Sequence, residues 1–367
     1  MKIIVKNSKE LCKAVKLLSP LANSNKGLPI LQHILVDATE GVRLIATDLE
    51  TVIRVDASEM FEVAKSGAVC IPPSFLKELA NETVIETDTE NQNFARIGKN
   101  KVAVMLAEDF PLFPDLDSQE MGRVEIGAII KRVIHASGES LSRFNTECIC
   151  LNFTTQEVVA TDSHRLAIVK DCLPHSPAIE NEDDQLLVNK TAAKILTGVK
   201  GEVSIARGKD HSIFSWDRIT MLARLVGGIF PEVYNVIPES FDFAIEVESL
   251  PLINTTKKAM KISRKGAAIE FKIDGEAMTV SATNPGLGEF RDDVKISNPL
   301  DVYCVFGINP TYLIDALKET GKTTKFEFVK EVLRPIKFTG DNPDFLSVIM
   351  PYVIDREFIS IPVNEEV

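Results

Sequence analysis

The sequence lacks an apolar run of about 18 residues, the length that a helix needs to cross a membrane. Its first residues, MKIIVKNSKE, hold only a short apolar patch among scattered charges, which is not the pattern of a signal peptide. The six cysteines form no CxxC pair and have no histidine at zinc-finger spacing, so we expect reduced and mostly buried thiols. These absences predict a cytoplasmic protein that holds no metal and no cofactor.

Positive charge is also in short supply. The formal net charge is −12 at pH 7, with 41 Lys and Arg against 53 Asp and Glu. A protein that binds nucleic acid needs cations to replace the counterions of the phosphates, so the composition by itself argues against that function. An acidic protein can still be basic on one surface, and the placement of the lysines therefore decides the question.

A convincing active site is missing as well. Asp162, Ser163 and His164 are the residue types of a hydrolase triad, but they are consecutive, whereas a triad converges from separate elements. No Gly-x-Ser-x-Gly elbow surrounds the serine. The Gly-Lys-Thr at 321–323 resembles part of a phosphate loop, but Ala316 stands where the first glycine is required. An enzyme is therefore the least favoured of the functions considered.

What the sequence does have is a threefold internal repeat. An apolar run enters an Ala-Thr-Asp or Ala-Thr-Asn turn at Thr47, Thr161 and Thr283. An amphipathic helical pattern precedes each turn, and a strand leading into a short helix follows it. A Phe-Pro or Met-Pro pair then closes each copy. The helical patterns lie at 8–22, 127–140 and 249–262, the strand–helix patterns at 70–80, 186–196 and 305–317, and the pairs at 110–111, 230–231 and 350–351.

Between these marks, apolar and polar residues alternate over short segments that are bounded by Gly, Asp and Asn, which is typical of strands. Asp274-Gly275 is expected at the centre of a hairpin turn. The sequence therefore predicts an α+β fold of three tandem domains. We place them at residues 1–119, 120–241 and 242–352, followed by a C-terminal extension at 353–367.

Basic residues gather on the predicted helices, opposite the apolar stripe. Charged residues often only solvate the outer side of a helix, but here the minority charge is segregated onto equivalent elements, which favours a surface for the backbone of duplex DNA. No aromatic residues interleave with these lysines, which argues against a platform for single strands. No recognition-helix signature predicts sequence readout. The candidates are Lys9, Lys13, Lys16, Lys77, Lys131, Arg132, Lys190, Lys194, Lys257, Lys258, Lys261 and Lys318.

The three domains, LPIL at 28–31, ATDSHRLA, FPEVYNVIP and INPTYLIDAL occur in an order that resembles the bacterial DNA polymerase III beta subunit, the replicative sliding clamp. The resemblance covers residues 1–352. It implies a head-to-tail homodimeric ring, with helices lining a central hole and antiparallel sheets outside. Such a ring would encircle duplex DNA and act as a processivity factor for the polymerase, without catalysis of its own.

The resemblance also implies a peptide-docking cleft between the second and third domains, for short motifs of the polymerase, the clamp loader and repair proteins. Apolar groups would form its floor, and a few polar groups would hold the peptide backbone. It adds Lys26 and Arg143 to the DNA-binding residues and places an edge strand near Val102 and Val104 at the dimer interface. The cleft residues that it implies are Thr161, Ser163, His164, Arg165, Leu166, Pro231, Val236, Asn309, Tyr312, Ile349, Met350 and Pro351.

Three departures from the family pattern are visible. Ser163 stands where the family usually has Gly, so a positive φ there would strain the serine. Asn235 stands where Arg is common, and residues 352–367 continue past the usual end. As hypotheses, this tail could cover the cleft, add a strand or extend freely. A divergent clamp with a narrower partner set is one consequence, and a related repeat protein that only scaffolds protein partners is the alternative function.

Overall fold

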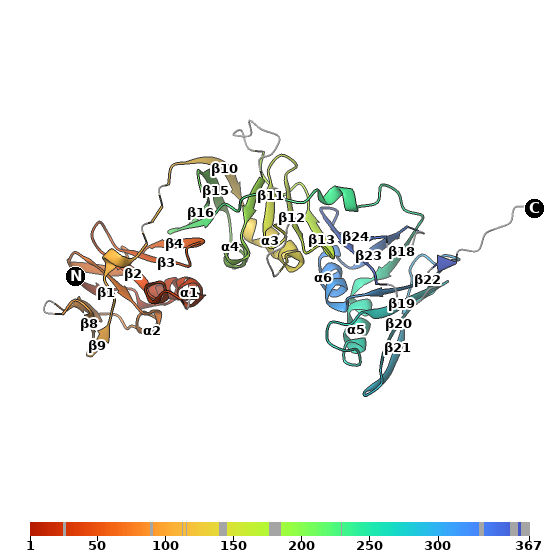
Figure 1. Ribbon diagram of the computed structural model, residues 1–367, viewed down its shortest axis with the longest axis horizontal. Coiled ribbons are helices and arrows are strands. Elements are labelled where there is room, and N and C mark those ends of the chain that lie inside the picture. The colour runs from red at the N-terminus through yellow and green to blue at the C-terminus, as the bar shows by residue number, and fades with distance from the viewer. Residues whose placement is uncertain are drawn as a thin grey trace, which may run out of the picture. The chain divides into compact units, whose positions relative to one another are not determined.

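The protein is known from a computed structural model, which describes residues 1–24, 27–88, 91–111, 113–114, 116–138, 145–175, 185–228, 230–329, 334–352 and 359–360. The chain forms two compact units, and Figure 1 shows their elements in chain order. The first consists of Met1–Gly127, Pro174–Glu180 and Thr191–Leu225, and the second of Ala128–Leu173, Asn181–Lys190 and Val226–Val367. The second sequence repeat contributes strands to both units. The domain boundaries near 119 and 241 therefore stay a prediction.

The described residues of the first unit form two antiparallel sheets and three helices. One sheet has five strands in the order β5-β1-β7-β8-β9, and the other has eight in the order β10-β15-β16-β17-β4-β3-β2-β6. Its strands are β1 (Lys2–Val5), β2 (Ile34–Asp37), β3 (Arg43–Thr47), β4 (Thr51–Asp56), β5 (Phe61–Lys65), β6 (Ala68–Ile71), β7 (Val84–Thr87), β8 (Phe94–Ile97), β9 (Asn100–Ala103), β10 (Ser118–Val124), β15 (Val203–Gly208), β16 (His211–Trp216) and β17 (Ile219–Arg224). Its helices are α1 (Ser8–Ser24), α2 (Pro73–Leu76) and α4 (Lys190–Leu196), with 3-10 turns η1 (Pro29–Gln32) and η2 (Ala107–Asp109).

The second unit is built in the same way. Its eight-stranded sheet has the order β14-β11-β12-β13-β25-β24-β23-β18, and its five-stranded sheet the order β21-β20-β19-β22-β26. The strands are β11 (Ile149–Asn152), β12 (Glu157–Thr161), β13 (Arg165–Val169), β14 (Gln185–Val188), β18 (Phe243–Glu248), β19 (Ile269–Asp274), β20 (Ala277–Asn284), β21 (Gly288–Lys295), β22 (Tyr303–Ile308), β23 (Thr323–Phe328), β24 (Ile336–Gly340), β25 (Phe345–Ile349) and β26 (Ile359–Ser360). The helices are α3 (Ile126–Val133), α5 (Ser249–Ala259) and α6 (Pro310–Thr320), with 3-10 turns η3 (Ile134–Ala136) and η4 (Val233–Val236).

Each eight-stranded sheet joins two successive repeats by the same rule. The strand after the Thr-Asp turn of one copy pairs with the strand that precedes the apolar-Pro pair of the next copy. In the first unit this joint is β4 with β17, and in the second it is β13 with β25, both antiparallel. The same two kinds of strand are left at sheet edges at the ends of the series, as β21 and β9.

The predicted helices form close to their expected bounds. In α1, Leu11, Val15 and Leu18 are fully buried while the lysines between them are exposed, which is the amphipathic pattern of the sequence. The second pattern is shorter than predicted. There α3 ends at Val133 and continues only as the 3-10 turn η3, because Ser137 and Gly138 come directly after it.

The hairpin predicted at Asp274-Gly275 is present, but its centre lies one residue later. Asp274 pairs with Ala277 as the last residue of β19, so Gly275 and Glu276 form the loop. Gly275 has a φ of 64°, which glycine adopts without strain.

The end of the chain adds a strand, one of the three outcomes considered for the tail. Ile359 and Ser360 form β26 and pair with Cys304 and Tyr303 of β22. Tyr352 makes an isolated bridge with Gly307 of the same strand. Within the described ranges, no helix has the length and apolar character to span a membrane.

Candidate docking pocket and DNA-facing surface

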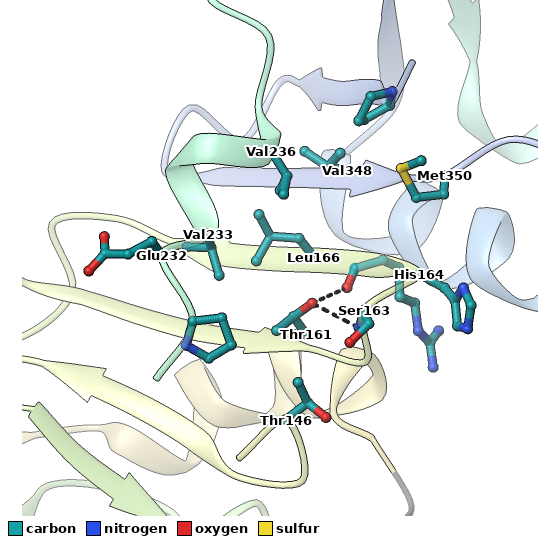
Figure 2. Close-up of a pocket in the computed structure, with 13 residues that line it drawn as sticks. Thr146, Thr161, Ser163, His164, Leu166, Glu232, Val233, Val236, Val348 and Met350 are labelled. Atoms are coloured by element: carbon teal, nitrogen blue, oxygen red, sulfur yellow. Dashed lines mark hydrogen bonds between the residues drawn. The ribbon is translucent and has the colours of Figure 1, made fainter. Parts of the chain in front are cut away.

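The second unit contains a mostly apolar pocket of about 230 Å³. Figure 2 shows its walls. They are the β12–β13 hairpin with Thr161, Ser163, His164 and Leu166, the turn η4 with Val233 and Val236, and the end of β25 with Val348 and Met350. The residues that line it are Thr146, Thr161, Ser163, His164, Arg165, Leu166, Pro231, Glu232, Val233, Val236, Pro335, Val348 and Met350.

The floor of the pocket is the outer face of a sheet. Leu166 and Val348 are paired across the joint between β13 and β25, and both are almost fully buried. Val233 and Phe230 belong to the same apolar cluster, together with Cys150 of β11 and Leu187 of β14. The joint between two sequence repeats therefore creates the apolar surface that the pocket exposes.

A tight turn closes one end of the pocket. The Thr161 hydroxyl donates to the carbonyl of Arg165 (2.7 Å) and accepts from the N–H of Ser163 (3.2 Å), as the dashed lines in Figure 2 show. The N–H groups of His164 and Arg165 both donate to Asp162 Oδ1, at 3.0 and 2.9 Å. The turn is thus fixed by side chains of the Thr-Asp pair, which is what the repeated motif encodes.

The first copy of the motif folds in the same way. Thr47 donates to the carbonyl of Thr51, and Asp48 accepts from two N–H groups. The third copy differs: the strand pairing continues past Thr283 to Asn284, which pairs with Gly288, so the Asn takes part in the ladder instead of the turn. The motif therefore encodes one turn twice and a variant of it once.

Ser163 adopts a φ of 72°, which confirms the expected strain at this position. Left-handed backbone costs an L-residue about 1–2 kcal/mol. We predict that Ser163→Gly raises the free energy of unfolding by about 1 kcal/mol and the melting temperature by about 2–4 °C. Ser163→Ala is the control, because it removes the hydroxyl but keeps Cβ, and it should leave the melting temperature unchanged. A thermal melt in which glycine destabilises the protein would contradict the strain.

Arg165 is held rigidly at the side of the pocket. Its guanidinium donates to Asp162 Oδ2 (3.0 Å) and to Asp315 Oδ2 on α6 (3.1 Å), and it lies 4.1 Å from the centre of the Tyr312 ring. Two carboxylates therefore neutralise this cation. His135 faces the same charged group, and burial lowers the pKa of its imidazole to about 4, so it is neutral at pH 7.

Asp162, Ser163 and His164 do not form a catalytic triad in the structure. The contacts of Asp162 go to backbone N–H groups and to Arg165, and His164 and Ser163 are exposed. Burial raises the pKa of the Cys148 thiol to about 11 and that of Cys150 to about 12, so neither is a thiolate nucleophile at neutral pH. Over the part of the chain that the structure describes, no group of three or more His, Cys, Asp or Glu is placed to hold a metal ion.

The structure brings eight of the predicted cleft residues into this pocket. They are Thr161, Ser163, His164, Arg165, Leu166, Pro231, Val236 and Met350. The other four do not line it. Asn309 caps α6 by accepting from the N–H of Thr311, Tyr312 lies under Arg165, and Ile349 and Pro351 are buried.

Five lining residues were not predicted: Thr146, Glu232, Val233, Pro335 and Val348. Alternation along a strand could have found Val348, because its neighbours Ser347 and Ile349 point to the opposite face. Val233 and Glu232 belong to the quoted FPEVYNVIP stretch. Thr146 and Pro335 carry no sequence signal that separates them from other loop residues.

Most of the lysines predicted to face DNA are exposed on or beside the helices, and their DNA-binding role stays a prediction. The lysines of α1 and Lys77, directly after α2, are exposed in the first unit, and those of α5 and α6 in the second. Some have partners: Lys13 with Glu10 (2.7 Å), Lys258 with Asp292 (3.3 Å) and Lys318 with Asp315 (3.3 Å). Within the described residues, no ion pair engages Lys9, Lys16, Lys77, Lys131, Lys194, Lys257 or Lys261, all of them exposed.

Two of the predicted DNA-binding residues have structural roles instead. Arg132 makes a bidentate contact with Asp344, an ion pair with Glu319 (3.4 Å) and a cation–π contact with Phe345. Lys190 donates to the carbonyls of Ser137 (3.3 Å) and Gly138 (2.9 Å). Because these cations are engaged within the protein, the structure argues against them as phosphate ligands. Lys26 and Arg143 lie outside the described residues.

The predicted edge strand is also found. β9 lies at the edge of its sheet, although the side chains of Val102 and Val104 are only 3% and 5% exposed. What this edge offers to another chain is therefore its backbone, not these side chains.

Comparison with known proteins identifies the fold. No protein-family model matches the chain. A sliding clamp from Bacillus subtilis superimposes with a TM-score of 0.84 at 20% identity, covering 97% of this chain and all of that one. A clamp from Caulobacter crescentus gives the same TM-score at 18% identity, over 96% of this chain and all of that one. The fold is that of a DNA polymerase sliding clamp, as predicted.

The sequence comparison finds relatives of the same kind. The chain is 25% identical over 364 residues to the beta sliding clamp of Pseudomonas aeruginosa, covering 93% of this chain and 97% of that protein. It is 23% identical over 317 residues to the beta sliding clamp of Staphylococcus epidermidis, covering 79% and 83%. The chain is thus a divergent relative of the beta sliding clamp, which confirms the resemblance seen in the motifs.

Proposed function

We propose that this protein is a DNA sliding clamp, the processivity factor of the replicative DNA polymerase. The observation that carries the proposal is that β9 and β21 each lie at the edge of a sheet, with one side open to a further strand in the described structure. Two internal joints, β4–β17 and β13–β25, follow one pairing rule, and applying it once more pairs β21 of one subunit with β9 of a second. Two such joints close a head-to-tail homodimeric ring.

Ring closure explains how an acidic protein can hold DNA. Exposed lysines on equivalent helices attract the phosphates without reading bases, and closure around the duplex prevents dissociation. The contacts can then stay weak enough for sliding. The protein needs no catalytic group for this task, and we assign it the role of a non-catalytic accessory subunit.

The pocket supplies the second half of the function. Its apolar floor at Leu166 and Val348 and its exposed wall at Val236 suit apolar side chains of a short extended peptide. We assign the DNA polymerase catalytic subunit, the clamp loader and other clamp-motif proteins as the partners that dock there.

The internal joints also predict the register of the ring interface. Phe290 pairs with Ala282 of β20, just as Ile53 pairs with Ala46 of β3, so Phe290 and Ile53 are equivalent positions. Val102 is the third residue of β9 after its hairpin and Met221 is the third residue of β17 after its hairpin, so these two positions are equivalent as well. Because Met221 pairs with Ile53, we expect Val102 to pair with Phe290 of the second subunit. Lys101 then lies opposite Arg291, and its ion pair with Asp88 (3.2 Å) offsets the like charge.

A disulfide tests this interface. The double variant Lys101→Cys/Arg291→Cys should form two intersubunit bonds per ring under oxidising conditions, because directly opposite antiparallel residues have Cα atoms about 4.5–5.5 Å apart, within disulfide range. Non-reducing electrophoresis should show a dimer. Lys99→Cys/Arg291→Cys, displaced by two residues, is the matched control and should cross-link poorly. Equal cross-linking of both pairs, or a monomer by mass at micromolar concentration, would refute the proposed ring.

A further inference from the structure

One wall of the docking pocket is held by few contacts. The 3-10 turn η4 contributes Val233 and Val236 to the lining, but the backbone hydrogen bonds of the turn are local, from Asn235 to Glu232 and from Ile237 to Tyr234. Val233 is buried in the apolar cluster, whereas Val236 is 53% exposed. Phe230 before the turn and Ile237 after it also pack in this cluster, whereas Tyr234 and Val236 are not members of it.

Tyr234 supplies a second point of attachment. Its hydroxyl donates to Oε1 of Glu157 at 2.5 Å, at the start of β12. Glu157 is only 7% exposed, and its other oxygen accepts from the hydroxyl of Thr155 at 3.0 Å. The ammonium of Lys170 lies 5.8 Å from the centre of the Tyr234 ring. The tyrosine is thus held by a charge-assisted hydrogen bond to a carboxylate that is itself fixed.

The two attachments contact different parts of the sheet. Val233 faces the floor at Leu166 and Val348, while Tyr234 reaches the opposite end of the β12–β13 hairpin from Ser163 and His164. Neither Tyr234 nor Glu157 lines the pocket. Burial, followed by the bond to Glu157, raises the pKa of Tyr234 above its usual range, so the hydroxyl stays a donor at all physiological pH values.

We propose that the Tyr234–Glu157 hydrogen bond positions the η4 wall of the docking pocket and so sets its affinity for peptides. Tyr234 is a positioning residue that acts through Val236 and does not touch the peptide. The inference rests on the proposed docking function and adds to it a pair of residues that no contact with a ligand would reveal.

The test uses the full-length protein and labelled peptides. Overlapping peptides that cover the polymerase catalytic subunit of the same organism identify the tightest binder, which then serves as the probe. Tyr234→Phe should weaken its binding about five- to tenfold, the value of one hydrogen bond of ordinary strength, because Tyr234 is 45% exposed and water weakens the bond. Glu157→Ala should weaken it equally, and the double variant should be no worse than either single one. Glu157→Gln should retain most of the affinity, because its amide oxygen still accepts from the tyrosine.

The controls separate positioning from stability and from the function itself. Tyr303→Phe removes a hydroxyl outside the pocket and should change nothing, and all variants should keep the wild-type dimer mass. Wild-type affinity in Tyr234→Phe, or a lowered melting temperature without weaker binding, would overturn the positioning role while leaving the docking function intact. If wild-type protein bound none of the peptides, the docking function and this inference would both be wrong.

Discussion

Reversing the charge of Lys16, Lys131 and Lys261 together should abolish stable retention of the protein on DNA. All three are exposed, on or directly after α1, α3 and α5, and none has an ion pair within the described residues. Each phosphate contact that the variant removes should reduce the slope of log K against log salt by about 0.9. Fluorescence anisotropy with a short duplex measures that slope, and a loading assay on nicked circular DNA measures retention.

The matched control reverses the same number of charges away from the helices. Lys65, Lys200 and Lys209 are exposed and lie on or beside strands, so Lys→Glu there changes net charge equally. This variant should keep most of the DNA retention. If both triple variants behaved alike, only the overall charge would matter and the helical surface would have no special role. If neither lost retention, the scaffold function would be the better account.

A charge placed in the pocket should abolish docking without unfolding the protein. Val236→Glu sets a carboxylate against the apolar wall, where an apolar peptide side chain would strip it of water. We expect at least about 100-fold weaker peptide binding, which corresponds to about 2.8 kcal/mol. Because Val236 is 53% exposed in the free protein, the melting temperature should change little. Isothermal titration calorimetry gives the affinity and a thermal melt gives the stability.

Val63→Glu is the control for that experiment. Val63 is 42% exposed on β5 of the first unit, so it offers a similar environment away from the pocket. It should bind peptide as the wild type does. Affinity for a short duplex, measured by anisotropy, should be unchanged in both variants, since neither residue belongs to the basic surface, whereas loader-dependent retention should be lost only in Val236→Glu. Peptide binding by Val236→Glu at wild-type affinity would place the docking site elsewhere.

The fold could be predicted largely because the repeat makes each local signal appear three times. A single Ala-Thr-Asp motif is a weak sequence signal for a turn. The motif recurs, however, and Thr47 and Thr161 stabilise the same turn through equivalent hydrogen bonds. Amphipathic spacing predicted the helices, as the buried Leu11 and Leu18 of α1 confirm. Helix ends were less predictable, since the short α3 and its 3-10 turn stop where Ser137 and Gly138 begin a different backbone path.

The pocket was predicted in part, because some of its residues signal their role locally and others do not. Leu166 and Met350 belong to recognisable motifs, whereas Val348 becomes part of the floor only through pairing between β13 and β25. The roles of Arg132 and Lys190 escaped the sequence for a related reason. The sequence of a helix does not show whether a basic side chain points into solvent or contacts a carboxylate or a backbone carbonyl that is distant in the chain. Arg132 contacts Asp344, and Lys190 contacts the carbonyl of Gly138.

The most direct test of the central claim is topological. The protein is loaded onto a nicked circular plasmid by a clamp loader, separated from free protein in high salt, and the plasmid is then cut once with a restriction enzyme. A closed ring predicts retention on the circle and rapid release after cutting, and the Lys16/Lys131/Lys261 reversal variant should not be stably retained even on the circle. Equal retention on circular and linear DNA, or release from both in high salt, would contradict the account.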